Sequence, residues 1–143
     1  MSTEQNKALS RRFMEEVFNQ GNLNLVDELV APDFVEHEEL PPGFPPGREA
    51  VKAFSTTFRG AFPDLKVTID DLIAEGDKVV IRGTWSGTHQ GELMGIAPTG
   101  KSVSFGVIDT VRIAGGKLVE HWGQMDTMRM MQQLGVIPAP EQG

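Results

Sequence analysis

The chain has 143 residues, of which 39% are hydrophobic and 23% are charged, a composition typical of one folded globular domain rather than a disordered segment. It contains no cysteine, which excludes disulfides, thiolate catalysis and metal sites built on sulfur. Its net charge is −7 and its basic residues are scattered, so no basic stripe is available to bind nucleic acid.

No apolar stretch approaches the roughly 20 residues that cross a bilayer. Residues 1–17 also lack the apolar run and the small-residue cleavage site of a signal peptide. We therefore expect a cytoplasmic protein with no membrane partner.

Apolar residues at helical spacing open the chain. Leu9, Phe13 and Val17 recur every four residues, which predicts an amphipathic helix. Ser2 followed by Gln5 has the spacing of a capping box, in which each side chain bonds the backbone N–H of the other residue.

Two shorter helices and one strand are expected next. Residues 25–30 are predicted to form a helix that Asn24 can cap, and residues 34–38 a short strand. The segment 40–47 holds four prolines and two glycines, which predicts a stiff loop too short to separate two domains. A third helix follows and stops at Pro63.

From Leu65 onward, apolar residues alternate with polar ones, which is the period of a half-buried strand. Four antiparallel strands are expected, with connections at 75–77, 91–100 and 114–116, and then a helix over about 126–134. Helices first and antiparallel strands afterwards predict an α+β fold, with one domain over residues 1–143. A curved antiparallel sheet would pack against three N-terminal helices.

Several common functional motifs are absent from the sequence. It has no GxGxxG, no GxxxxGK[ST] and no GxSxG, so a dinucleotide site, a phosphate-binding loop and a hydrolase nucleophile elbow are all unsupported. The histidines are His37, His89 and His121, none of them paired at i,i+4, so a metal site could form only by convergence in the fold. We expect no metal and no cofactor.

Three segments together carry a resemblance to a known family: GTHQG at 87–91 with MGIAPTG at 94–100, GKLVEHW at 116–122, and QLG at 133–135. With PDF at 32–34 and PGRE at 46–49, the chain resembles the SnoaL-like polyketide cyclases, or predicted ester cyclases, of the nuclear transport factor 2-like superfamily. The resemblance implies a cone-shaped α+β barrel, usually dimeric, with a pocket between the concave sheet and the helices.

Cyclases of this family close a ring by intramolecular aldol condensation without metal or cofactor. The resemblance places their acid/base aspartate two residues after a histidine on the last strand. Here that histidine is His121, but the aspartate position is Gly123. Asp109 stands where those cyclases have a pocket histidine, and His89 keeps the histidine of the G-x-H-x-G segment.

Two neighbouring positions bear on the missing carboxylate. Limonene-epoxide hydrolase, a relative by fold, needs a carboxylate at the position of Gly123 and an Arg-x-Asp on the middle strand. Arg82 is followed two residues later by Thr84, so that reaction is disfavoured. Asp126 lies three residues after Gly123, where we expect it to cap the terminal helix.

Strand alternation assigns the inward faces. On the last strand these are Val119, His121, Gly123 and Met125, with Leu118 and Trp122 outward; on the preceding strand they are Phe105, Val107, Asp109, Val111 and Ile113. An apolar pocket with a few polar groups suits a small lipophilic ligand. Further candidate pocket residues are His37, Phe54, Arg82 and Trp85.

A hairpin register sets the polar centre of this pocket. If 114–116 is a three-residue loop, Asp109 lies directly opposite His121, close enough for a hydrogen bond. His121 would then act as acid/base through its free ring nitrogen, Asp109 would orient it, and His89 or His37 would assist as an electrophile.

Two function classes fit these features, with a third behind them. The first is a cofactor-free cyclase or isomerase that acts on a small lipophilic carbonyl compound. The second is a binding protein that holds such a molecule without turning it over, and the third is a protein-interaction module. We also expect a homodimer formed by the outer face of the sheet, because Trp122 beside Leu118 would otherwise expose an apolar patch.

Overall fold

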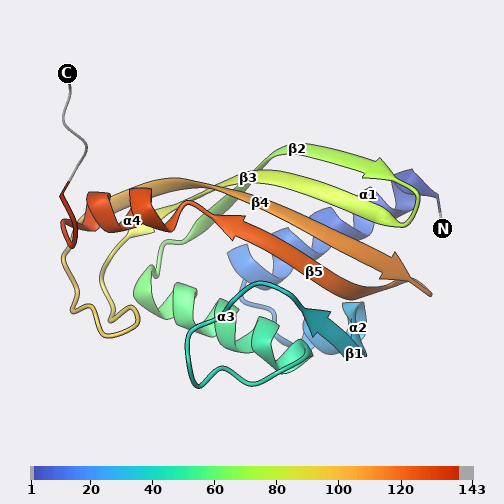
Figure 1. Cartoon of the computed structure of the whole chain (residues 1–143), viewed down its shortest axis with the longest axis horizontal. Coiled ribbons are helices and arrows are strands. Elements are labelled where there is room, and N and C mark those ends of the chain that lie inside the picture. Colours follow the sequence, from blue (N-terminus) through green and yellow to red (C-terminus); the bar gives the residue numbers. More distant parts are fainter. Residues whose placement is uncertain (1, 139–143) are drawn as a thin grey trace.

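A five-stranded sheet forms one side of the molecule and helices cover its concave face (Figure 1). The computed structural model describes residues 2–138. In chain order the elements are α1 (Thr3–Phe13), the π-helical segment η1 (Met14–Asn19), α2 (Asn24–Leu29), β1 (Val30–Glu36), α3 (Arg48–Ala61), β2 (Lys66–Glu75), β3 (Lys78–Thr88), β4 (Ser102–Ala114), β5 (Lys117–Met125) and α4 (Thr127–Leu134). The predicted α+β class is confirmed.

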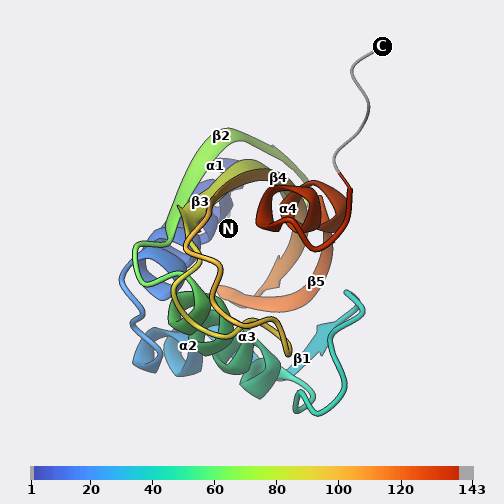
Figure 2. The same ribbon diagram turned by 90° about the vertical axis from the view of Figure 1, so that its left-hand side faces the viewer.

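The sheet order is β1-β5-β4-β3-β2, and β2 to β5 are antiparallel neighbours. β1 instead pairs with β5 in the parallel direction, so the expectation of a wholly antiparallel sheet was wrong for this strand. The strands form an arc whose open side is occupied by α2 and α3, and the sheet does not close into a barrel (Figure 2). A short strand far from its partner in sequence carries no signal of its direction, which is why β1 was misjudged.

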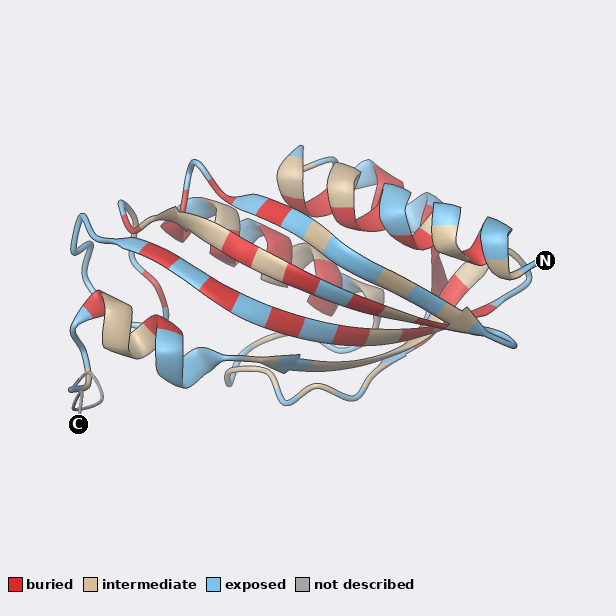
Figure 3. Ribbon diagram, turned by 90° about the horizontal axis from the view of Figure 1, so that it is seen from above, coloured by how far each residue is buried: buried red, intermediate tan, exposed pale blue. Residues whose placement is uncertain are grey.

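The inward face of β4 is the most regular feature of the core. Its residues alternate between buried and exposed along the strand (Figure 3), and the buried ones are the predicted Phe105, Val107, Asp109, Val111 and Ile113. Trp85 of β3 packs among aromatic rings, with centroid distances of 5.2 Å to Phe18 and 5.6 Å to Phe58. The core therefore lies between β3–β4 and the N-terminal helices.

The N-terminal helix begins as predicted and ends differently. Ser2 and Gln5 form the expected capping box. After Phe13 the helix continues as a π-helical turn, and at its end the Asn19 side chain bonds the backbone of edge strand β2. Its Oδ1 accepts from the Val67 N–H at 2.6 Å and its Nδ2 donates to the Val67 C=O at 2.9 Å. One amide thus satisfies two backbone groups at the sheet edge.

The β4–β5 hairpin differs from the expected register. Its loop has two residues, Gly115 and Gly116, with φ of 58° and 74°, so Ala114 pairs with Lys117. Beyond Ile113 and Leu118, Val119 is an extra residue on β5, a bulge that restores pairing at Arg112 and Glu120.

The bulge has two consequences for the residues that follow. His121 lies opposite Val111, and Asp109 lies opposite Gly123, two residues away from the predicted pairing. Because two is an even number, Asp109 and His121 still share a face. Before the bulge the predicted faces were wrong: Leu118 is buried in the core, with 1% of its surface exposed, and Val119 is only partly buried.

Asp126 caps the start of α4: its side chain accepts a hydrogen bond from the Arg129 N–H at 3.1 Å, as expected. The helix ends at Gly135, where φ is 79°. Within residues 2–138, no helix combines the length and apolar character needed to cross a bilayer.

Trp122, on the outer face of the sheet, is less exposed than expected. The ring of Trp122 stacks on His37 with centroids 4.7 Å apart, and Lys78 Nζ lies 5.6 Å from the Trp122 ring centroid. Exposed apolar side chains on this face include Ile73 and Ile108, which are 61% and 51% exposed.

Replacing Asn19 with Ala should lower the free energy of unfolding by about 1–3 kcal/mol, because two backbone groups of Val67 lose their partner. Urea unfolding measures this. Asn22→Ala, at an exposed position three residues along, is the matched control and should change stability little. Equal stability of the two variants would contradict the bridging role.

The homodimer stays a prediction. Ile73 and Ile108 lie on the same outer face as Trp122 and supply apolar surface that a partner sheet would cover. Light scattering should give twice the mass of the chain at micromolar concentration, and Trp122→Ala should shift the protein toward monomer. A wild-type monomer under these conditions would end the idea.

Candidate functional site

A small cavity lies between the concave face of the sheet and the helices α1, η1 and α3. Its walls are mainly apolar and include the predicted Phe54, Trp85, Val107 and Met125. Four polar residues line it: Glu36, Glu38, Asp109 and His121. The cavity volume is about 40 Å³, room for a few water molecules and too little for an organic ligand in this conformation.

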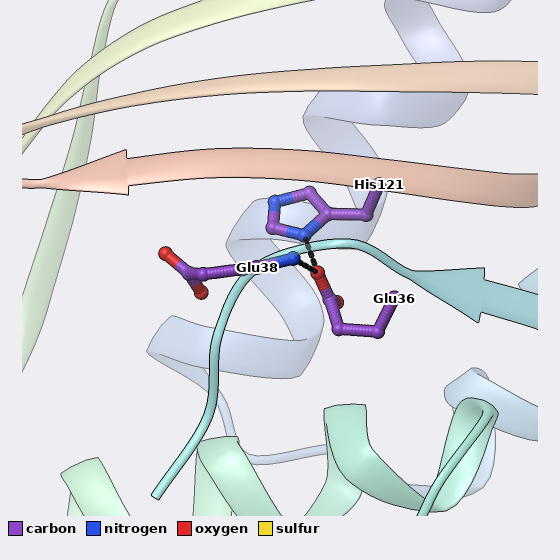
Figure 4. A group of neighbouring side chains, drawn as sticks. All are labelled: Glu36, Glu38 and His121. Carbon is purple, nitrogen blue, oxygen red and sulfur yellow. Dashed lines mark hydrogen bonds and ion pairs between the residues drawn. The ribbon is translucent and has the colours of Figure 1, made fainter.

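The polar residues are brought together by three neighbouring strands. Asp109 comes from the middle of β4, His121 from β5, and Glu36 from the last position of β1. The parallel pairing of β1 with β5 sets Glu36 beside His121, and Glu38 follows two residues later (Figure 4). This placement depends on the β1–β5 pairing that sequence patterns did not indicate.

His121 is held between two carboxylates. Its Nε2 lies 2.7 Å from Asp109 Oδ1, so the predicted contact between these residues is confirmed, although it is diagonal rather than directly across the strands. Its Nδ1 lies 2.5 Å from Glu36 Oε1. A carboxylate only accepts, so both ring nitrogens must carry hydrogen and the ring is an imidazolium.

The electrostatics agree with this assignment. Burial opposes the charged ring, but hydrogen bonds to Asp109 and Glu36 outweigh it and raise the pKa of His121 to about 10. The expected free ring nitrogen is therefore wrong: both nitrogens are occupied. A cation that keeps its proton at neutral pH is poorly suited to exchange one.

Glu38 behaves differently from its neighbours. Burial raises the pKa of its carboxyl group to about 7; the His121 cation lowers it, and the Asp109 and Glu36 carboxylates raise it further. At neutral pH this group is present in both protonation states. Neither Glu36 nor Glu38 was among the candidate residues from the sequence.

A usable signal for both residues was present in the strand itself. Phe34 is apolar and buried, so alternation places Glu36 and Glu38 on the same inward side and His37 on the other. His37 does lie on the outer face, where its Nε2 is 2.7 Å from Glu120 Oε2.

Two other predicted site residues lie away from the cavity. His89 is buried beyond it, where Nδ1 accepts from the Thr99 N–H at 3.2 Å and the ring packs 5.6 Å from that of Phe62. Arg82 is exposed on the outer face and forms an ion pair with Asp71, with Nη2 and Oδ2 2.7 Å apart. The structure gives neither residue access to the polar cluster.

Three side chains of the cluster have the spacing of a metal site. Ligand atoms of Glu36, Glu38 and His121 lie within 4.8 Å of one another. An ion would have to displace one carboxylate from His121, whose nitrogens are both engaged. The expectation of no metal remains a prediction.

Comparison with known proteins identifies the family of this chain. The SnoaL-like polyketide cyclase family matches residues 8–134. The chain belongs to this family. Nogalonic acid methyl ester cyclase of Streptomyces nogalater is 28% identical over 129 residues, covering 85% of this chain and 92% of that protein.

Two further relatives agree. Aklanonic acid methyl ester cyclase DauD of Streptomyces sp. (strain C5) is 31% identical over 139 residues, covering 91% of this chain and 83% of DauD. The solved structure of TsrD from Streptomyces laurentii superimposes with a TM-score of 0.86 at 31% identity, covering 96% of this chain and 99% of TsrD.

Gly123, at the position where the resemblance puts the aspartate of SnoaL-like cyclases, is closely surrounded. A Cβ atom at this residue would lie 2.7 Å from His121 Cε1, 2.9 Å from Asp109 Oδ1 and 3.0 Å from Glu38 Oε1. A side chain therefore could not enter without moving these groups. Carboxylates from two other strands or segments occupy the surroundings that an aspartate would need.

The His121 cluster predicts how stability depends on pH. A raised pKa means that the folded state holds its proton more tightly, so the stabilisation is complete below pH 6.5 and is lost as pH rises through about 10. The sequence has no tyrosine or cysteine, and Glu38, whose pKa is about 7, titrates only at the lower end of this window. The thermal midpoint should therefore fall between pH 6.5 and 10.

His121→Gln should be less stable and should show a weaker fall over that window, because the titrating cation is gone. His37→Gln makes the same substitution on the outer face and should keep the wild-type fall. Differential scanning calorimetry across the pH series measures both. An unchanged pH profile in His121→Gln would contradict the charged assignment.

Proposed function

We propose that this SnoaL-like protein is a cofactor-free acid/base enzyme that cyclises or isomerises a small lipophilic carbonyl compound. The observation that carries the proposal is the cluster of Asp109, His121, Glu36 and Glu38 set into an otherwise apolar wall. Proton transfer in such surroundings is favoured, since a carboxyl group shielded from water has a pKa near the working pH. The names of two relatives, both methyl ester cyclases, support a polyketide ester as substrate class.

The reaction that these relatives suggest is an intramolecular aldol closure. A base removes a proton from a carbon next to a carbonyl group, and the enolate carbon attacks a second carbonyl carbon of the same molecule. The resulting alkoxide takes a proton, so the product is an isomer of the substrate. A hydrogen-bond donor that faces the enolate oxygen would stabilise its negative charge.

Trp85 supplies a polar group on the apolar side of the cavity. Its Nε1–H is buried and has no hydrogen-bond acceptor within residues 2–138. Buried donors are normally paired, so this one is suited to a carbonyl oxygen of a bound molecule. Aromatic rings of Phe18 and Phe54 beside it would stack on a flat ligand.

The cavity must widen to admit such a molecule. Residues 37–47, which connect β1 to α3, form neither helix nor strand and contribute Glu38 and Leu40 to the wall. We expect this segment to be the part that moves, because strands and helices form the other walls.

A binding protein that uses the same cavity is the second candidate. The observation that favours it is Gly123, which removes the carboxylate that the family's cyclases use on this strand. Binding of a polyketide ester without turnover would support this alternative.

Nogalonic acid methyl ester and aklanonic acid methyl ester are the probes for turnover, with conversion followed by liquid chromatography. The wild-type protein should form an isomeric product in buffer that contains a chelator. Asp109→Asn should lower kcat roughly 10²-fold, because removing one carboxylate beside His121 changes the charge balance of the cluster, whereas Asp71→Asn on the outer face should not. If neither ester is turned over, the proposal is contradicted.

A further inference from the structure

Glu38 is the member of the polar cluster whose carboxyl group is not already engaged. Both nitrogens of His121 are bonded, and the acceptors are carboxylates of Asp109 and Glu36. Glu36 Oε1 also accepts from the backbone N–H of Glu38 at 3.0 Å. Within residues 2–138 no side chain or backbone group is hydrogen-bonded to the Glu38 carboxyl, so it is available to a bound molecule.

Strand pairing brings this carboxyl group to the position that Gly123 leaves open. Glu36 pairs with His121 in the parallel direction. Parallel strands advance together, so the residue two places beyond Glu36 is level with the residue two places beyond His121. Glu38 is therefore level with Gly123, and its Oε1 lies 3.0 Å from where a Cβ of residue 123 would be.

We propose that Glu38 is the catalytic acid/base of this site and replaces, from the segment after β1, the carboxylate that β5 lacks at Gly123. The proposal rests on the proposed function, and the experiment below separates the two. It also explains how a family member can keep the reaction without an aspartate on its last strand.

Burial, first, and then the charged groups that face Glu38 set its proton affinity. They are Glu36 from β1, Asp109 from β4 and His121 from β5, while the cavity residues of α1, η1, α3 and β3 within the described chain are apolar or, for Trp85, uncharged. With the His121 cation offset by two carboxylates, the net charge around Glu38 is negative. Together with burial this holds its pKa at about 7, where base and acid forms are both populated.

The proton balance closes on this one residue. The ionised Glu38 carboxylate takes the proton from the carbon next to a carbonyl group, and the C–H electron pair forms the enolate. The enolate carbon bonds to the second carbonyl carbon, whose π electrons move to oxygen. The protonated Glu38 then gives its proton to that oxygen and returns to the ionised form, so no co-reactant is needed.

Glu38→Gln is the decisive variant and Glu39→Gln, at the exposed neighbouring position, is its matched control. With aklanonic acid methyl ester as probe, Glu38→Gln should lower kcat by at least about 10²-fold, and Glu39→Gln should leave it unchanged. In the wild-type protein kcat/KM should fall as pH drops below about 7, because the free enzyme needs ionised Glu38. A Glu38→Gln enzyme within threefold of wild type would overturn the inference and leave the proposed function standing.

A second measurement needs no substrate. Carbon-13 NMR of glutamate-labelled protein should show one side-chain carboxyl that titrates near pH 7, absent from Glu38→Gln and present in Glu39→Gln. If neither ester is turned over, the proposed function fails while this titration still tests the protonation on which the inference depends. A Glu38 carboxyl that titrates below pH 5 would overturn it.

The converse exchange tests the replacement itself. Gly123→Asp in a Glu38→Ala background returns the carboxylate to β5 and removes the group 3.0 Å from the new Cβ, while His121 Cε1 and Asp109 Oδ1, at 2.7 Å and 2.9 Å, must still shift to admit it. Circular dichroism checks that the double variant is folded. Its kcat should then be at least tenfold higher than that of Glu38→Ala. A folded double variant in which NMR still shows a protonated His121 at neutral pH, but which recovers no kcat, would contradict the idea that the two positions are equivalent.

Discussion

The paired contact of His121 with Asp109 and Glu36 is the interaction on which the site depends. It joins β4, β5 and β1 through side chains, in addition to the backbone ladder. Removing the imidazolium would leave two partly buried carboxylates without a counter-charge, which is far more costly than losing one hydrogen bond. The contact of Glu36 with the charged His121 ring therefore helps to hold the short parallel strand β1 on the sheet.

Around that contact the fold keeps water scarce. Aromatic rings from η1, α3 and β3 pack together and against Phe105 on the inward face of β4, so the few polar groups interact in a medium of low dielectric constant. In these surroundings the pKa of His121 is about 10, so its ring stays protonated, whereas the pKa of Glu38 is about 7, so its carboxyl group is only partly protonated at neutral pH. A firmly held charge beside a readily exchanged proton is the division of roles that acid/base enzymes often use.

Much of the fold followed from periodicity, because long amphipathic helices and alternating strands carry their own signal. The Asp109–His121 contact was predicted from a wrong register, and it survives because a shorter loop and the Val119 bulge together shift the pairing by an even number. Alternation from Phe34 indicates that Glu36 and Glu38 face inward, but their closeness to His121 depends on a parallel pairing between residues 85 apart, which the sequence does not signal. His89 was named from its family segment, and that segment folds beyond the cavity.

The Val119 bulge also shows where this chain can change in length. Deleting Val119 would leave a regular ladder in which Leu118, Glu120 and His121 keep their partners on β4, so Trp122 and His121 would stay on their present faces. Deleting Thr110, in the regular part of β4, would instead turn Asp109 to the outer face, away from His121. The number of residues is therefore constrained along the regular ladder, and the bulge is the one place in this hairpin where a residue can be lost without moving the charge cluster.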